Sequence, residues 1–342
     1  MAAEDRQTQR LQRKNRQIAR LQAELERERA EAFDASRLVW IFGSSRTGST
    51  WLAGMFGELP GGLFWSEPVV GALFGEFYYD RFPHRRGAQF LFADRYRAVW
   101  LRGIRSMVLD GARARSGSRP GYVAINEPHG SVGARLLSEA LPESRFVLLV
   151  RDPRDVVASV YAAHRTGGFA TKKPWHDPSR VAEKRPSFVS SAAKTYLWNL
   201  EHASDAFIHH PGPRALVRYE DLRRDTVEEF SRLCSELDLP GNRGDQEGAV
   251  ATHDWEAIQV KKGEDSFHRK ASPGSWADDL NPEQVETIEE ICRPVLDAFY
   301  NGDVDPTLLK PSEHNRVPSA RVLWDRVLQA EAALMPPGEL TD

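Results

Sequence analysis

Short apolar runs alternate with helical stretches through the middle of the chain. The runs predict buried strands at residues 38–42, 122–125, 146–150 and 215–219. Other stretches predict helices at residues 49–58, 154–164, 226–237 and 281–300, the last opened by Asn281, Pro282 and Gln284. Strands that are apolar throughout need cover on both faces, and strands that alternate with helices pair in parallel. The pattern therefore predicts an α/β fold with a central parallel sheet flanked by helices.

The first 33 residues follow a different pattern. Residues 1–33 carry eight Lys or Arg, six Asp or Glu and no Gly or Pro. The apolar positions in this segment are Leu11, Ile18, Leu21 and Leu25, with seven-, three- and four-residue spacing. This spacing is typical of a helical seam of about two heptads. The segment is therefore either a solvated helix or a short coiled coil that assembles a homo-oligomer.

The remaining segments set the domain organisation. The α/β domain is predicted at residues 37–303, and residues 311–342 are predicted to form a linker and a C-terminal amphipathic helix. Within the domain, residues 81–119 contain ten arginines and two acids, which predicts an Arg-rich helical insertion. Residues 171–186 are polar and interrupted by prolines, as in a loop that covers a site.

Composition narrows the function classes. The chain has 342 residues, with 46 Lys or Arg against 49 Asp or Glu, and a net charge of -3 disfavours a nucleic-acid partner. The two cysteines, Cys234 and Cys292, are too few for a disulfide framework and fit a reducing compartment. Because no apolar run reaches the length of a membrane span and no signal peptide is visible, we expect a cytoplasmic protein without a transmembrane segment.

The segment between the first predicted strand and helix is rich in glycine and hydroxyl side chains. It reads Gly43-Ser44-Ser45-Arg46-Thr47-Gly48-Ser49-Thr50-Trp51. Unpaired backbone amides and a helix N-terminus converge in such a loop and favour an anion. A Walker A loop needs lysine directly after its second glycine, whereas Ser49 follows Gly48 here. Since strand 146–150 also ends in Arg151 and not in a magnesium-binding acid, a nucleoside triphosphatase is disfavoured.

A second anion site is predicted where strand 146–150 ends. Arg151 leaves the carboxyl end of this strand, the edge at which ligands of doubly wound sheets collect. Ser159 lies on the next predicted helix, so that a guanidinium and a hydroxyl can reach one phosphate. The alternative is an exposed helix start with local ion pairs.

These two segments resemble motifs of the sulfotransferase family, which uses 3'-phosphoadenosine 5'-phosphosulfate (PAPS). Residues 45–51 are similar to the family's 5'-phosphosulfate loop, Pro-Lys/Arg-Ser-Gly-Thr/Ser-Thr-Trp. Ser45 replaces the proline, and Arg46 takes the Lys/Arg position. Residues 151–159 resemble the motif whose Arg and Ser bind the 3'-phosphate. The resemblance implies a P-loop-like sulfotransferase fold.

Two further motifs follow in the family's order. Residues 218–222 are similar to its Tyr-Glu-Asp-Leu, whose Tyr lies near the adenine. Residues 267–276 resemble its late loop, Arg-Lys-Gly…Gly-Asp-Trp, with Ala271 and Ser275 in place of Gly and Asp. The resemblance implies binding of PAPS, and of its product PAP, by Ser45, Arg46, Thr47, Gly48, Ser49, Thr50, Trp51, Arg151, Ser159, Tyr219, Arg269 and Lys270. Trp51 either stacks on the adenine or packs in the core.

The implied chemistry is sulfuryl transfer without a metal ion. Arg46 would stabilise charge on the departing PAP, and a general base would take the acceptor's proton. Glu67 is our first candidate base, because several branches of the family carry a catalytic Glu there and its apolar neighbours would make it more basic. His129 is the second candidate and Glu127 the third. Asn126 stands where many members have lysine.

The acceptor implied by the resemblance is a hydroxyl or amine of a small molecule, sugar or lipid. The arginines of residues 81–119 would suit an anionic acceptor, although a solvated helical insertion explains them equally well. Residues 171–186 are the other candidate for acceptor recognition. Two alternatives stay open: a P-loop kinase or other nucleoside triphosphatase, and a non-catalytic scaffold that retains a nucleotide pocket.

Overall fold

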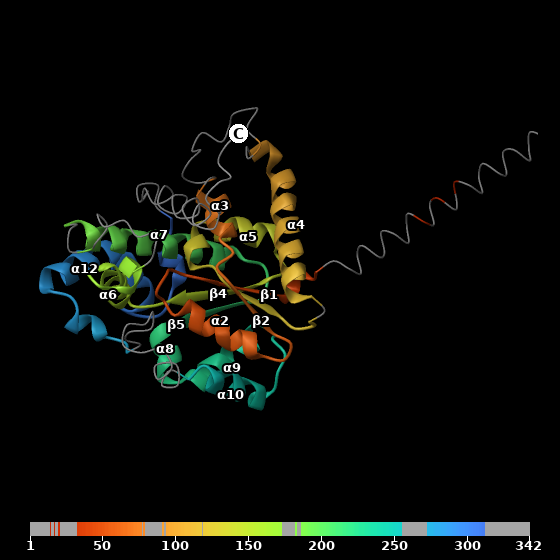
Figure 1. Ribbon diagram of the computed structural model, residues 1–342. Helices are drawn as coiled ribbons and strands as arrows, with labels where there is room; N and C mark the ends of the chain where they lie inside the picture. The colour runs from red at the N-terminus through yellow and green to blue at the C-terminus, as the bar shows by residue number, and fades with distance from the viewer. Residues whose placement is uncertain are drawn as a thin grey trace, which may run out of the picture.

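A five-stranded parallel sheet forms the centre of the molecule. The computed structural model describes residues 33–76, 94–117, 119–172, 186–254 and 272–311, together with residues 14, 17, 20, 78, 91 and 182. Within these residues the strand order is β2-β3-β1-β4-β5 (Figure 1). The strands are β1 (Leu38–Phe42), β2 (Leu63–Ser66), β3 (Val123–Asn126), β4 (Arg145–Val150) and β5 (Arg214–Arg218). All four pairings are parallel, as the sequence pattern predicted.

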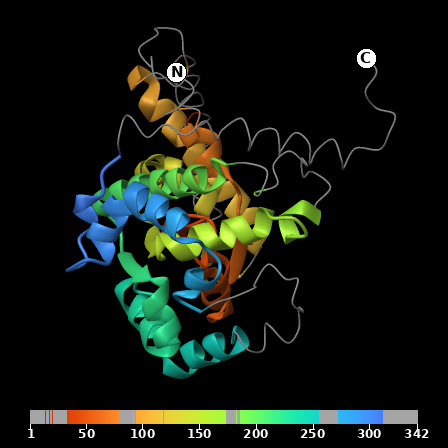
Figure 2. The ribbon, with the colours of Figure 1, turned by 90° about the vertical axis from the view of Figure 1, so that its left-hand side faces the viewer.

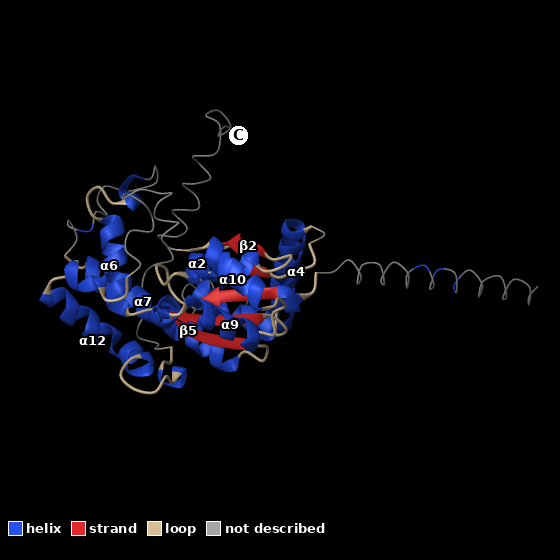
Figure 3. Cartoon of the chain, turned by 90° about the horizontal axis from the view of Figure 1, so that it is seen from below, coloured by secondary structure: helices blue, strands red, loops and turns tan. Residues whose placement is uncertain are grey.

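Helices cover both faces of the sheet. One face packs against α2 (Ser49–Glu58), α8 (Tyr219–Arg224), α9 (Thr226–Glu236) and α10 (Arg243–Thr252). The other face packs against α4 (Arg97–Ser116), α5 (Ala134–Ala140), α6 (Pro153–His164), α7 (Phe188–His209) and α12 (Pro282–Phe299). Short elements complete the fold: α3 (Val70–Glu76), η1 (Ala35–Arg37), η3 (Asp94–Tyr96), η4 (Pro128–Gly133), η5 (Phe169–Lys172), η8 (Ser275–Asp278) and η9 (Pro306–Leu308). Figure 3 shows α2, α9 and α10 in front of the sheet when it is seen from below.

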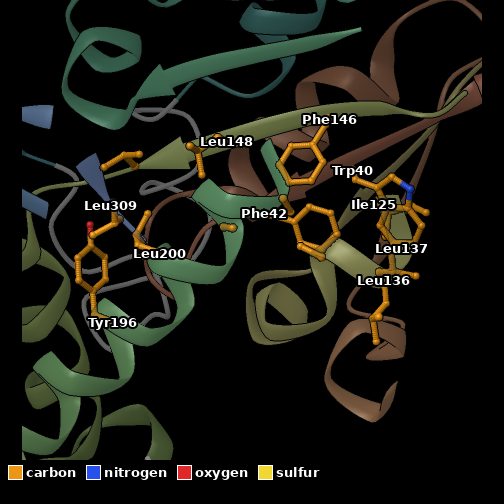
Figure 4. Packing of buried hydrophobic residues seen from close by; sticks show 14 of the residues in the cluster. Trp40, Phe42, Ile125, Leu136, Leu137, Phe146, Leu148, Tyr196, Leu200 and Leu309 are labelled. Carbon is orange, nitrogen blue, oxygen red and sulfur yellow. The ribbon is translucent and has the colours of Figure 1, made fainter. Parts of the chain in front are cut away.

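Alternation along β1 explains how one strand serves two cores. Trp40 and Phe42 point into the core beneath α5 and α7, whereas Val39 and Ile41 point into the core beneath α2. The ring of Phe42 lies 5.6 Å from that of Trp40 and 4.8 Å from that of Phe146 on β4 (Figure 4). Helices α7 and α12 pack side by side on the outside of this cluster (Figure 2). The contact between Phe42 and Phe146 adds side-chain packing to the parallel pairing of β1 with β4.

Most predicted elements are confirmed to within one or two residues. The sequence predicted β1 and α2 with their observed bounds, and α12 begins with the predicted capping box between Asn281 and Gln284. Six described strands and α-helices were missed: β2, α3, α5, α7, α8 and α10. Strand β2 has only four residues, three of them partly buried and one exposed, too short a run for a periodicity argument. Helix α7 begins at Phe188, and its N-cap residue Ser187 makes no side-chain capping bond.

Several predictions fall wholly or largely outside the described residues. Among these are the helical seam of residues 1–33, most of the loop at 171–186, the C-terminal segment after residue 311, and the residues Arg269 and Lys270. Of the Arg-rich insertion, residues 97–116 form α4, which confirms its helical character there. Among the described helices, none combines the length and apolar character that a membrane-spanning segment requires.

Candidate active site

The carboxyl ends of the five strands bring together segments that are far apart in the sequence. Each strand is followed by, or ends in, a candidate residue. These are the loop 43–48 after β1, Glu67 after β2, Asn126 at the end of β3, Arg151 after β4 and Tyr219 after β5. Because the strands are parallel, these positions all lie at the same end of the sheet, which the carboxyl ends of the strands form. The predicted phosphate loop and the second predicted anion site follow β1 and β4, which are neighbours.

The loop after β1 has the backbone geometry of an anion cradle. Gly48 immediately precedes α2 and has φ +96°, a left-handed conformation that glycine adopts without steric cost. A Cβ atom at Gly48 would lie 2.8 Å from the ring of Tyr219. Since this cap residue has no side chain, no side-chain oxygen competes for the first amides of α2, where Ser49 and Thr50 lie. These amides can therefore bind an anion.

Side chains beneath the loop hold its shape. The Thr47 hydroxyl donates to the carbonyl of Ser44 at 2.7 Å. Ser131 of η4 accepts from the Gly43 amide at 3.1 Å and donates to the Gly43 carbonyl at 2.7 Å. Asn199 of α7 donates to the Ser44 hydroxyl at 3.3 Å. These bonds support the loop from within the protein, and nothing in the sequence motif signalled Ser131 or Asn199.

Two arginines from the two predicted anion sites lie together. The Arg46 Nε donates to the Ser159 hydroxyl at 3.0 Å, and the Arg151 Nη1 donates to the Arg46 carbonyl at 3.0 Å. Burial and, after it, the charge of Arg151 together lower the pKa of Arg46 to about 10. Arg46 therefore stays protonated at neutral pH. Two buried positive charges repel each other, and a bound anion would offset this repulsion.

Aromatic rings surround this arginine pair. The Arg151 guanidinium lies 4.2 Å from the centre of the Tyr219 ring, and the Tyr196 hydroxyl donates to the Arg151 carbonyl. Trp51 meets Tyr219 edge to face at 6.1 Å and donates its indole N–H to the His253 carbonyl at 2.8 Å. Trp51 is 6% exposed. These contacts favour a packing role for Trp51 beneath the site.

Asp155 joins the late loop to the second anion site. Its carboxylate accepts from the amides of Gly274 at 2.8 Å and Trp276 at 3.0 Å, and the Arg154 guanidinium lies 4.5 Å from the centre of the Trp276 ring. Burial raises the pKa of Asp155. The sequence reasoning missed this residue, although it is the second acid of the Arg-Asp-Pro-Arg-Asp run and could have been noticed there. The contact brings the end of the 267–276 motif beside α6.

Glu67 lies at the same end of the sheet, on the side of β2. Contrary to the expectation of apolar neighbours, Glu67 is exposed, because β2 is an edge strand whose last residue, Ser66, already faces solvent. Its amide donates to the Asn126 Oδ1 at 3.1 Å, and the Asn126 Nδ2 donates to the Thr50 hydroxyl at 3.3 Å. The Asn126 side chain therefore bridges Glu67 and the first turn of α2.

The two other candidate bases have different surroundings. Glu127 is 1% exposed, and its carboxylate accepts from the amides of Val69 at 3.1 Å and Gly71 at 3.0 Å. Burial raises the pKa of Glu127 to about 8, although both amide bonds act in the opposite direction. His129 is half-buried on η4. Glu67 is therefore the exposed candidate, and Glu127 is already engaged by backbone.

Two of the five arginines of α4 pair with acids. Arg97 pairs with Glu139 of α5 at 2.6 Å, and Arg105 pairs with Glu143 at 2.8 Å. These two cations therefore give no support to an anionic acceptor. Within the described ranges, no group of three or more His, Cys, Asp or Glu side chains is arranged to hold a metal ion.

Comparisons with known proteins agree with the sheet and its loops. The model of the family described as the sulfotransferase domain matches residues 36–300. A comparison with curated proteins finds no match.

Similar solved structures have low sequence identity. The mouse sulfotransferase SULT7A1 complexed with PAP is 11% identical, with 80% of this chain and 88% of that chain covered and a TM-score of 0.47. The sulfotransferase STF9 from Mycobacterium avium is 15% identical, with 79% of each chain covered and a TM-score of 0.44. A retinol dehydratase in complex with androsterone and inactive cofactor PAP is 14% identical, with 78% and 82% covered and a TM-score of 0.42.

Proposed function

Because the chain belongs to the sulfotransferase domain family, we propose that it transfers the sulfuryl group of PAPS to a hydroxyl or amine of a small-molecule, sugar or lipid acceptor and releases PAP. One observation carries the choice of donor. Arg46 and Arg151, from two separate anion motifs, lie together in one buried place. A nucleotide with phosphates at both its 3' and 5' positions matches two adjoining cationic sites.

The residues present fit such a donor. The first amides of α2 and the loop 43–48 would hold the 5'-phosphosulfate, and Arg151 with Ser159 would hold the 3'-phosphate. The direct bond between Arg46 and Ser159 supports one continuous ligand site, because it joins the two motifs across 3.0 Å. Tyr219, whose ring packs against Arg151 at 4.2 Å, is the residue that the resemblance places near the adenine.

The reaction makes one bond to sulfur and breaks another. The acceptor oxygen or nitrogen would bond to sulfur while the bond from sulfur to the 5'-phosphate oxygen breaks, leaving the electron pair on PAP. Arg46 stays charged at neutral pH and would stabilise this oxygen electrostatically, since arginine does not give up a proton there. The loop and helix amides are already oriented for the same task.

The acceptor must also lose a proton, and we propose Glu67 as the general base. Its exposure leaves the carboxylate free to meet an acceptor, and its backbone is tied through Asn126 to Thr50 on the phosphate loop's helix. His129 remains the second candidate. Both oxygens of Glu127 accept from backbone amides, which favours a different role for that residue.

Nucleotide binding and transfer test the proposal together. Calorimetry with PAP, against ATP and Mg²⁺, separates a sulfotransferase from a kinase or nucleoside triphosphatase. Sulfate-labelled PAPS, offered with a panel of hydroxyl and amine acceptors, then separates an enzyme from a nucleotide-binding scaffold. We expect PAP to bind more tightly than ATP with Mg²⁺, and label to reach an acceptor. Tighter binding of ATP with Mg²⁺ would overturn the proposal.

A further inference from the structure

The turn that carries Glu67 has a backbone conformation that its residues do not favour. Glu67 has φ +45° and Val69 has φ +61°. Valine is β-branched, and such residues very rarely adopt a left-handed conformation. Pro68, between them, further restricts the backbone. A turn of this kind persists only where its surroundings impose it.

Two neighbouring residues of the β3 end supply the constraint. Asn126 is fully buried and binds the Glu67 amide through its side-chain oxygen at 3.1 Å. Its main-chain carbonyl accepts from the same amide at 3.1 Å. Glu127 binds the amides of Val69 and Gly71, one through each carboxylate oxygen. Four hydrogen bonds, on the amides of Glu67, Val69 and Gly71, thus hold the turn from Glu67 to the start of α3.

The same residues relate this turn to the phosphate loop. In the sheet register, Asn126 lies opposite Ser66 of β2 on one side and Ile41 of β1 on the other. Its amide nitrogen donates to the Thr50 hydroxyl on α2 at 3.3 Å, while its oxygen holds Glu67. One buried side chain therefore spans the gap between the proposed donor site and the proposed base.

We infer that Asn126 and Glu127 are positioning residues that fix the Glu67 carboxylate relative to the phosphate loop. The inference rests on the proposed function and assigns neither residue a contact with substrate. Glu127 is 1% exposed and lies against Gly130, where a Cβ atom would come within 2.3 Å of its Oε1. Its two oxygens also have partners already. Loss of Glu127 would move Glu67 without touching the nucleotide site, whereas loss of Asn126 would also release the Thr50 hydroxyl on α2.

The test compares transfer rate with nucleotide affinity in Glu127→Gln. Glutamine keeps the size of the side chain but turns one acceptor oxygen into a donor that faces a backbone N–H. Because burial raises the pKa of Glu127 to about 8, with the charge of Glu67 acting in the same direction, assays run at pH 9, where the carboxylate is ionised. We expect kcat to fall by on the order of 10²-fold, since small misplacements of a reacting group have effects of this size. PAP affinity should change by less than about twofold.

Asn126→Ala should lower kcat by a larger factor than it lowers PAP affinity, because it releases the Glu67 amide and, on α2, only the Thr50 hydroxyl. Glu143→Gln is the matched control, since Glu143 is a surface carboxylate paired with Arg105. Hydrogen exchange at the amides of Val69 and Gly71 should speed up in Glu127→Gln and stay unchanged in the control.

A second-site change separates positioning from direct catalysis. In the Glu127→Gln background, Val69→Gly should recover part of the lost kcat, because glycine adopts the left-handed conformation without steric cost. If Glu127 acted as a base itself, a glycine at position 69 could not replace it. If Val69→Gly recovers no kcat and exchange rates are those of wild type, the inference is overturned. Full turnover by Glu127→Gln would overturn it as well. If wild-type protein binds PAP but sulfates no acceptor, the proposed function fails and the inference fails with it, whereas the other two results overturn the inference alone.

Discussion

The candidate site has two halves that are built differently: a donor half at β1, β4 and β5, and an acceptor half at β2 and β3. On the side of β1, β4 and β5, Arg46, Arg151 and Tyr219 are held by buried packing and by a loop whose hydroxyls bond inward. On the side of β2 and β3, an exposed Glu67 stands on a strained turn held by Asn126 and Glu127. The first half is made to bind charge, and the second to place one carboxylate. Substitutions in the two halves should therefore change different measurements.

The largest effect is expected from Arg46→Ala. Removing this charge should lower kcat by on the order of 10³-fold, as losing one donor to a developing anion does. Stability should change much less than kcat, because loss of the bond to Ser159 is offset by relief of the repulsion from Arg151. Steady-state turnover and urea unfolding check the two parts. Arg97→Ala, at the surface pair with Glu139, is the control. Normal turnover in Arg46→Ala would show that the positive charge of the donor half does not contribute to the chemical step.

The second effect concerns pH and Glu127. Burial raises its pKa from 4.5 to about 8, so the folded protein holds a proton that the unfolded chain has released. Stability from this group is complete below pH 4.5 and is lost as pH rises through 8. Between pH 5 and pH 9 we expect wild type to lose about 4 kcal/mol of unfolding free energy relative to Glu127→Gln.

Urea unfolding across that pH range measures the difference. Glu143→Gln should run parallel to wild type there, because Arg105 lowers the pKa of Glu143 and it titrates at more acid pH. Parallel curves for wild type and Glu127→Gln would mean that Glu127 ionises normally in the folded protein. The acceptor half would then be less tightly packed around this carboxyl.

The third effect is the turnover of Glu67→Gln. Loss of a general base lowers kcat by on the order of 10²-fold, while PAP affinity should change by less than about twofold. Glu236→Gln, on the surface pair with Arg232 of α9, should leave both quantities unchanged. Wild-type kcat in Glu67→Gln would transfer the role of base to His129.

What the sequence predicted follows the same division. The loop 43–48 and the limits of β1 and α2 were predictable because their signals are local: a glycine before a helix, and an apolar run of five residues. The partners of that loop were not, because the bond from Arg46 to Ser159 joins residues 113 apart. Glu67 was found through the resemblance, but its exposure follows from β2 being an edge strand, which no local pattern shows.

The smallest effect tests whether the donor half extends to the late loop. Asp155 accepts from the amides of Gly274 and Trp276, and asparagine would keep only one of these bonds. If residues 267–276 close on the 3'-phosphate, as the family resemblance implies, Asp155→Asn should weaken PAP binding by about fivefold, the value of roughly one hydrogen bond. Asp205→Asn, on the surface of α7, is the control. Faster hydrogen exchange at Gly274 and Trp276 with unchanged PAP affinity would show that the tether serves the fold alone, and the donor half would then end at Arg151, Ser159 and Tyr219.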